Sequence, residues 1–137
     1  MEITIGIIGE IETIVTDVDT AAKWGSGLVP VYSTPALVGL LERASVQALK
    51  GHVPEGKTTV GGRIDVRHLA ATPVGMQVHA RAELIEMDDR KLVFKVQAWD
   101  EMEQIGEAVH ERFLVDEAKF LIRVQAKVHS SSIQKTR

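Results

Sequence analysis

The 137-residue sequence contains no cysteine. This absence excludes disulfide bonds, catalysis by a thiol and zinc sites built from cysteine. A domain of this length buries enough apolar surface to fold without such cross-links. Apolar residues make up 45% of the chain and charged residues 26%, which is typical of a folded globular protein and not of a disordered one.

The sequence also lacks any apolar run near the ~20 residues that a membrane-spanning helix needs. Residues 1–4 carry an acidic side chain and no basic one, so we expect no secretory signal and a cytoplasmic protein. The 16 basic and 19 acidic residues are dispersed along the chain and give a formal net charge of −3. Because there is no basic stripe, we expect no nucleic-acid partner and, without an apolar span, no membrane partner.

No repeat, low-complexity segment or linker divides the chain. We therefore expect one domain over residues 1–128. The last stretch, residues 129–137, is polar and without periodicity, and we expect it to be a flexible tail.

One helix is predicted clearly. Ser33 or Thr34 can cap it, and Pro35 suits its first turn. Gly51 is placed to end its last turn. Residues 36–41 are apolar on every side of this helix, which indicates a helix buried on all sides.

Strand signals dominate the remainder of the chain. Apolar and polar residues alternate in residues 63–70, 78–86 and 91–99, as expected of strands with one buried face. Residues 3–16 are rich in β-branched side chains and are also predicted as strand. Residues 104–115 read as strand too, with an irregular phase that a bulge would explain.

The order along the chain is therefore strand, loop, buried helix and then several antiparallel strands. A single curved sheet is the economical way to cover one apolar helix. We therefore predict an α+β hotdog fold, in which an antiparallel β-sheet wraps around one long central helix. Residues 117–128 are compatible with either helix or strand.

Two ionisable residues occupy positions where the pattern predicts apolar side chains. Glu42 follows the apolar run of the helix, and His68 lies on the apolar face of the strand 63–70. Buried charges are costly unless they are paired, so such positions are enriched in functional sites. Thr34 is a third candidate, because a helix N-terminus presents free N–H groups that could stabilise an oxyanion. The structural alternatives are a simple helix cap, an outward-facing glutamate and a hydrogen-bonded core histidine.

The other candidate positions give weaker signals. His110 lies in the strand of irregular phase, and no histidine has a metal-ligand spacing, so we predict no metal site. Gly61-Gly62 can mark a β-bulge. On a regular helix Thr34 and Glu42 would lie ~12 Å apart along the axis, too far for a hydrogen bond. They would either meet across a dimer interface or contact different parts of one bound acyl group.

Three segments carry a family resemblance. They are residues 33–44 (STPALVGLLERA), residues 66–75 (VRHLAATPVG) and residues 106–112 (GEAVHER). In order, they resemble the central helix, the histidine strand with its Ala-Thr-Pro-x-Gly turn, and the late strand of the fluoroacetyl-CoA-specific thioesterase family. The order and spacing are consistent over about residues 28–125, and the conjunction of the three is fairly specific.

The resemblance implies a catalytic trio that falls on Thr34, Glu42 and His68. It also implies that the backbone of Gly61 lies near the thioester, and that the protein is a hotdog homodimer with active sites at the subunit interface. Whether dimers pair into tetramers is left open. The family's fluoroacetyl enzyme gates its acyl pocket with an aromatic residue ahead of the threonine, where this chain has Leu28. The resemblance therefore does not carry the fluoroacetyl substrate over to this chain.

We therefore expect an acyl-CoA thioesterase that hydrolyses a short-chain acyl-CoA to free acid and CoA, with no metal or organic cofactor. Glu42 would attack the thioester or activate water, His68 would protonate the departing thiolate, and Thr34 would orient the reacting group. Two alternatives remain. One is a hotdog enoyl-CoA hydratase or dehydratase, which also uses a histidine with a carboxylate. The other is a module that binds acyl-CoA without cutting it.

Overall fold

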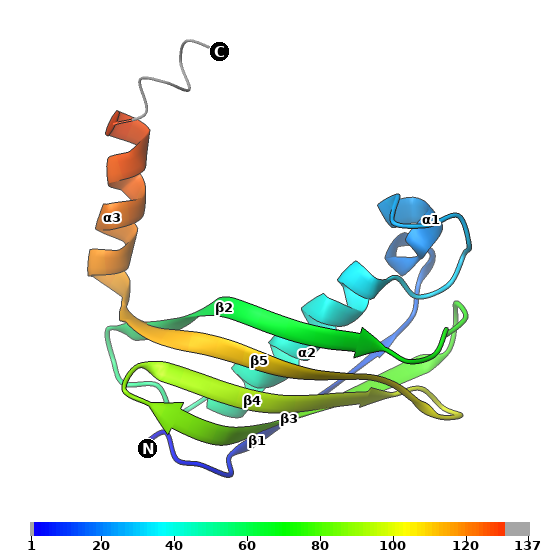
Figure 1. The fold of residues 1–137 in the computed structure, drawn as a ribbon, viewed down its shortest axis with the longest axis horizontal. Coiled ribbons are helices and arrows are strands. Elements are labelled where there is room, and N and C mark those ends of the chain that lie inside the picture. The colour runs from blue at the N-terminus through cyan, green and yellow to red at the C-terminus, as the bar shows by residue number, and fades with distance from the viewer. Residues whose placement is uncertain (1, 131–137) are drawn as a thin grey trace.

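A computed structural model describes residues 2–130, which form a five-stranded antiparallel sheet with one long helix across one face (Figure 1). Along the chain the elements are β1 (Ile8–Ile14), η1 (Asp17–Asp19), α1 (Ala21–Trp24), α2 (Thr34–Leu49), β2 (Lys57–His68), β3 (Gln77–Asp88), β4 (Lys91–Trp99), β5 (Gln104–Asp116) and α3 (Glu117–Ser130).

The strands lie in the order β1-β3-β4-β5-β2, and each neighbouring pair is antiparallel. β2 begins at Lys57, earlier than the predicted start at residue 63. Its pairing with β5 shifts register between Gly61 and Arg63, so Gly62 is the extra residue of a β-bulge. β2 is an edge of the sheet, and no strand in residues 2–130 pairs with its outer side.

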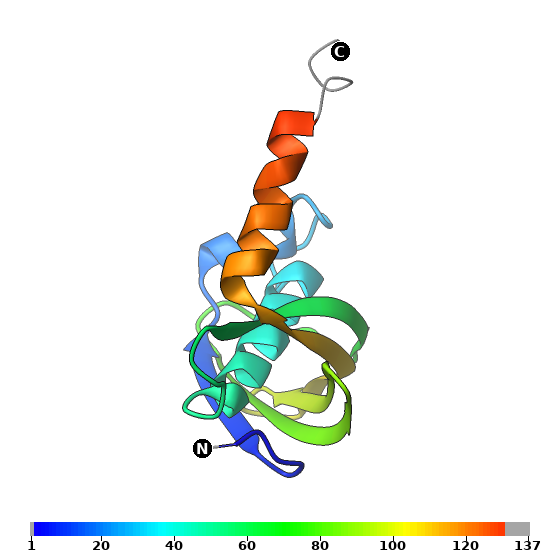
Figure 2. The same cartoon turned by 90° about the vertical axis from the view of Figure 1, so that its left-hand side faces the viewer.

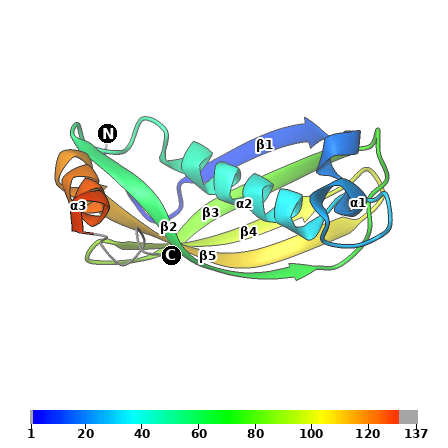
Figure 3. The ribbon, with the colours of Figure 1, turned by 90° about the horizontal axis from the view of Figure 1, so that it is seen from above.

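α2 confirms the predicted helix. The Ser33 Oγ accepts a hydrogen bond from the Ala36 N–H at 3.1 Å, so Ser33 is the N-cap and Thr34 is the first helical residue. Gly51, with a φ of 82°, follows the end of the helix in the left-handed region that favours glycine. With the curled sheet beneath this helix, the arrangement is the α+β hotdog fold that the sequence predicts (Figure 3).

Only one face of α2 is covered. The covered face packs on the sheet and consists of Leu37, Leu40, Leu41, Ala44, Ala48 and Leu49. Arg43 and Val46 are exposed on the other side. The prediction of a helix buried on all sides is therefore wrong for a single chain, because the sheet lies on one side of the helix only (Figure 3).

β1 lies unusually close to α2. A Cβ on Gly9 would overlap the backbone of Ala44 and Ala48. Glycine is therefore required here because the backbones of a strand and a helix touch without side chains between them.

β5 has a regular phase with polar residues on its buried side. Gly106, Ala108, His110 and Arg112 face the helix. The pattern looks irregular in the sequence because two of these four inward residues are polar. The predicted bulge is present, but at the start of the strand, where the pairing with β4 shifts register between Ala98 and Trp99.

The chain continues into α3, which leaves the sheet at the end of β5 and projects past the β2 edge (Figures 1 and 2). His129 and Ser130, where the sequence predicts a flexible tail to begin, are the last two residues of α3. The rest of that segment, residues 131–137, lies outside the described residues. Within residues 2–130, no helix has the length and hydropathy needed to cross a membrane.

Candidate active site

Two side chains far apart in the sequence meet at one end of the sheet. Thr34 is the first residue of α2, and His68 is the last residue of β2. The Oγ1 of Thr34 lies 2.8 Å from the Nδ1 of His68, within hydrogen-bond distance. Both side chains line an open cleft of about 350 Å³, together with Val31, Tyr32, Leu69, Ala70 and Ala71. In this arrangement of a hydroxyl with an imidazole, the histidine can activate an oxygen nucleophile.

The surroundings of His68 favour its neutral form. Burial lowers the pKa of His68 below its ordinary value, and the backbone of Ala70 opposes this in part. The Nε2 of His68 is buried and hydrogen-bonds to no atom of residues 2–130. When Nδ1 accepts the hydroxyl proton of Thr34, Nε2 carries a proton without an acceptor. Because an unsatisfied buried donor is costly, we expect a group from outside this chain to complete the site.

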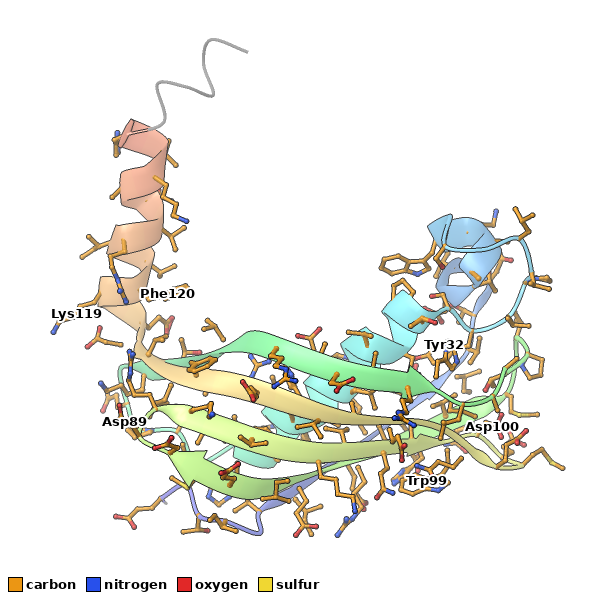
Figure 4. All side chains as sticks on the ribbon, viewed as in Figure 1. Tyr32, Asp89, Trp99, Asp100, Lys119 and Phe120 are labelled. Atoms are coloured by element: carbon orange, nitrogen blue, oxygen red, sulfur yellow. The ribbon has the colours of Figure 1, made fainter. Side chains whose placement is uncertain are left out.

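Hydrogen bonds fix the backbone that leads into α2. The N–H of Tyr32 donates to the Thr72 carbonyl at 2.8 Å, and the N–H of Ser33 donates to the Asp19 carbonyl at 2.9 Å. The buried Thr72 hydroxyl in turn donates to the Asp100 carboxylate at 2.9 Å. Burial alone would raise the pKa of Asp100, but two backbone N–H groups and Thr72 hydrogen-bond the carboxylate and lower it. Tyr32 and Asp100 lie at the same end of the molecule (Figure 4), so this network holds the end of α2 that carries Thr34.

Glu42 lies two turns farther along α2, in a second group of polar side chains. It faces the point where a Cβ on Gly61 would lie. That point is 3.2 Å from the Glu42 Oε2, 3.4 Å from the Arg112 Nη1 and 3.4 Å from the His110 Cε1. Because Gly61 has no side chain, the backbone of β2 is accessible between a carboxylate and a guanidinium.

His110 and Arg112 form the base of this second group. Their side chains are nearly inaccessible, with 1% and 7% of their surface exposed. The Nδ1–H of His110 donates to the Arg63 carbonyl at 2.8 Å, and its Nε2 accepts from the Arg112 Nη1 at 3.1 Å. Arg112 also donates to the hydroxyl and the carbonyl of Thr59, at 3.0 and 3.1 Å. These bonds require a neutral His110 and hold the guanidinium in one orientation.

The charges of this group compensate one another in part. Burial lowers the pKa of His110; the bond to Arg63 opposes that shift, and the positive charge of Arg112 adds to it. Burial also lowers the pKa of Arg112. The carboxylate of Glu42 opposes both shifts. Glu42 is therefore the negative charge that accompanies a buried guanidinium here.

The sequence pattern made His110 only a weak candidate for a site residue, and Arg112 was not identified as a candidate at all. The signal that could have identified them was the alternation of β5 itself. Counting in steps of two from Gly106 places both residues on the face of the small residues Gly106 and Ala108. Two polar residues that continue a buried face are candidates for a site.

Two of the three predicted catalytic residues meet within one chain. Thr34 and His68 lie within hydrogen-bond distance, whereas no hydrogen bond or ion pair within residues 2–130 links Glu42 to either of them. Gly61 lies with Glu42. Leu28, in the loop before α2, has 97% of its surface exposed and does not line the Thr34–His68 cleft. In the described part of the chain, no three histidine, aspartate or glutamate side chains are grouped to hold a metal ion.

Comparisons with known proteins identify the family. The profile of the family "Fluoroacetyl-CoA-specific thioesterase" matches residues 15–118. The fluoroacetyl-CoA thioesterase of Streptantibioticus cattleyicolor is 38% identical over 97 residues, which is 71% of this chain and 70% of that protein.

Solved structures agree with this assignment. A structure of the fluoroacetyl-CoA thioesterase is 30% identical, with a TM-score of 0.86 over 93% of this chain and 98% of that one. A Thermus thermophilus protein, described as a thioesterase superfamily member, is 27% identical, with a TM-score of 0.85 over 94% and 98% of the two chains. A hot-dog-like protein from Thermanaerovibrio acidaminovorans, 23% identical with a TM-score of 0.83 over 90% and 91%, shares the fold. The chain thus belongs to the fluoroacetyl-CoA-specific thioesterase family and is a thioester hydrolase of the hotdog fold.

Proposed function

We propose that this protein hydrolyses a short-chain acyl-CoA to the free acid and CoA, at a site that two copies of the chain build together. The observation that carries the proposal is the contact between the Thr34 hydroxyl and the His68 imidazole in an open cleft. Family membership supplies the thioester as the bond that is cut.

The contact makes Thr34 the first candidate for the nucleophile, a role that the sequence assigned to Glu42 or to water. His68 would take the hydroxyl proton while the Thr34 oxygen bonds to the thioester carbonyl carbon. The carbon–sulfur bond then breaks, and His68 returns the proton to the CoA thiolate. Water would hydrolyse the resulting acyl ester and regenerate the Thr34 hydroxyl.

In this scheme Glu42 contributes to the active site of the other subunit, across the subunit interface. Along β2, Gly61 and His68 are separated by about 20 Å, at roughly 3.3 Å per residue. A long unpaired edge strand is a template for pairing with a second chain. Antiparallel pairing of two β2 edges about a two-fold axis turns the His68 end of one strand toward the Gly61 end of the other. The partner's Glu42 would then approach the unsatisfied Nε2 of His68, and the partner's Gly61 would approach the thioester.

The remaining expectations extend the proposal. Arg112, held beside Gly61, supplies a positive charge toward the acyl end of the site. Leu28, exposed in one chain, would contact the acyl group only if the partner covers the loop before α2. A reaction of this kind needs no organic cofactor or metal. We also propose that the protein is cytoplasmic. We propose that it forms a homodimer, or a tetramer of two dimers.

The test is a screen of acetyl- to medium-chain acyl-CoA, with released thiol as the readout. Rapid quenching followed by peptide mass spectrometry would find the acyl group on the peptide of Thr34, or on that of Glu42 if the carboxylate attacks. Binding without thiol release would favour a non-catalytic module, and a change in enoyl-CoA absorbance without thiol release would favour a hydratase. Absence of thiol release across the screen would refute the proposal.

The shared site has its own test. Thr34→Val and Glu42→Gln chains are mixed and allowed to exchange subunits. Each mixed dimer then contains one intact site, so an equal mixture should recover about a quarter of wild-type activity. If each site came from a single chain, the mixture would stay as inactive as its two components.

A further inference from the structure

α3 is joined to the rest of the structure at one end only and projects past the β2 edge of the sheet (Figures 1 and 2). From Glu117 to His129, every residue except Phe120 is exposed. A helix of 14 residues is only marginally stable in water by itself, and most helices in proteins are stabilised by the packing of an apolar face. α3 therefore needs a further surface to pack against.

α3 has apolar side chains on two opposite faces. One face, with Phe120 and Val124, lines a cleft together with Phe113 of β5. The opposite face, which we call the outer face of α3, surrounds a hollow of about 410 Å³ and consists of Leu121, Ile122, Gln125, Ala126 and His129. In the described part of the chain, no residue outside α3 lines this hollow. Leu121 and Ile122 have 53% and 68% of their surface exposed, so a single chain leaves the outer face uncovered.

A second apolar surface lies at the other end of the molecule, beside the Thr34–His68 cleft. It comes from the segment before α2 and the loop after β2, which a bridge between Val31 and Pro73 holds side by side. We call it the cleft-side surface; its large apolar side chains are 48% to 97% exposed and are Trp24, Leu28, Val29, Leu69 and Val74. Figure 3 shows α1, which ends at Trp24, at the end of the sheet opposite α3.

The proposed pairing of two β2 edges brings these two surfaces together. Lys57, the first residue of β2, pairs with Asp116, the residue before α3, whereas the cleft-side surface adjoins His68 at the other end of β2. In an antiparallel pair, the first residues of one strand lie beside the last residues of the other. The α3 of one copy would therefore lie beside the cleft-side surface of the other, and the two-fold axis would repeat this contact in the reverse direction.

We propose that the outer face of α3 packs on the cleft-side surface of a second copy of this chain and closes one side of its Thr34–His68 cleft. The inference rests on the homodimer of the proposed function. Leu121 and Ile122 would contact the partner's loop that carries Leu28, so two apolar surfaces that are exposed in one chain would be buried in the dimer. Leu28 would thereby be held at the cleft, and each copy would cover the site of its partner.

The first experiment places a charge on the outer face of α3. Ile122→Glu should raise the dissociation constant of the dimer at least about tenfold, because the interface would have to bury a carboxylate. The matched control is Ile14→Glu on the β1 edge of the sheet, where 58% of the isoleucine surface is exposed; it should leave the dissociation constant unchanged. Sedimentation velocity over a dilution series measures both values, with circular dichroism to confirm folding. An unchanged dissociation constant for Ile122→Glu, or a wild-type protein that is monomeric, would overturn the proposal.

The second experiment locates the contact. Because the chain has no cysteine, single cysteines can be introduced without a competing thiol. An Ile122→Cys chain is mixed with a Leu28→Cys chain and treated with a short bismaleimide. The mixture should yield a covalent dimer, whereas Ile14→Cys mixed with Leu28→Cys should not. A covalent dimer of Ile122→Cys alone, with none of it joined to Leu28→Cys, would place two α3 helices against each other and overturn the proposal.

The same variants separate failure of this inference from failure of the proposed function. Thiol release by Ile122→Glu should be lost at protein concentrations below its dissociation constant and recover above it, because the site needs two copies. The cross-link without hydrolysis of any acyl-CoA would leave the contact intact and refute the proposed function. Hydrolysis of acyl-CoA by a dimer that forms no such cross-link would leave the proposed function intact and overturn the contact.

Discussion

Thr34 and His68 are 34 residues apart in the sequence, yet their Oγ1 and Nδ1 atoms lie 2.8 Å apart. One side chain comes from the start of a helix and the other from the end of the edge strand. The curvature of the sheet around α2 brings these two ends together. Because the contact joins two separate elements, either one can be changed without altering the local structure of the other.

Removal of the Thr34 hydroxyl should abolish most of the activity. Thr34→Val keeps the size of the side chain but leaves His68 without its partner, so kcat should fall about 10²–10³-fold. Thr34→Ser keeps a hydroxyl and should retain far more activity. Thiol release from acyl-CoA, with circular dichroism to confirm folding, is the measurement. Similar rates for the valine and serine variants would show that the hydroxyl takes no part.

The acid limb of the pH profile should lie below the ordinary pKa of histidine. Burial lowers the pKa of His68, so the neutral imidazole that accepts a proton remains present below its ordinary value of 6.5. The acid limb of kcat/KM against pH should therefore have its midpoint below pH 6.5. A midpoint at or above pH 6.5 would contradict burial as the dominant influence on the pKa of His68 in the active protein.

The free energy of unfolding should fall as the pH is lowered through the range in which histidine side chains gain a proton. The pKa of His110 is lower in the folded protein than its ordinary value of 6.5, mainly because of burial. Between those two values the unfolded chain binds a proton that the folded chain does not, so the free energy of unfolding decreases as the pH falls below about 6.5. His110→Gln can keep both hydrogen bonds without titrating and should show a shallower decrease. Urea unfolding at a series of pH values measures both slopes, and equal slopes would rule out His110 as the source.

The adjacent glycines of the β2 bulge should respond differently to alanine. A Cβ on Gly61 would crowd Glu42, Arg112 and His110 at 3.2 to 3.4 Å, so Gly61→Ala should reduce kcat with a small loss of stability. A Cβ on Gly62 would overlap the ring of Phe113, so Gly62→Ala should mainly destabilise the fold, by about 1–3 kcal/mol. Kinetics and denaturant unfolding on the same two variants would test the contrast. Equal effects on both measurements would contradict it.

Gly9→Ala should be among the most destabilising small substitutions in this chain. The added methyl group would overlap the backbone of α2, which cannot rotate away as a side chain can, so we expect a loss of at least about 1–3 kcal/mol. The control is Gly39→Ala within α2, where the new Cβ would meet only the end of the Arg43 side chain at 3.6 Å. That substitution should not destabilise, because alanine is favoured over glycine in a helix by about 1 kcal/mol. The unfolding midpoints of the two variants should therefore shift in opposite directions.

Local chemistry explains why much of the fold could be predicted. The cap at Ser33, the proline after it and Gly51 set the two ends of α2, because each acts on its immediate neighbours. Alternation in β3 and β4 predicted most of the buried side chains, since a strand has a period of two; Val93, which is buried out of phase, is the exception. The antiparallel strands and a single apolar helix then allow few arrangements other than a curled sheet.

The sequence by itself determined the helix and its caps, the faces of the strands, and the identity of Thr34, Glu42 and His68 as unusual residues. Only the tertiary structure decided how these residues group: Thr34 with His68, and Glu42 with Gly61, His110 and Arg112. The physical reason is that side-chain periodicity shows on which face of its own element a residue lies. It does not show which residues of a distant element lie next to it in space. These spatial contacts are determined by the sheet register, by the bulge at Gly62 and by the close approach of β1 to α2. All three depend on contacts between segments far apart in the chain.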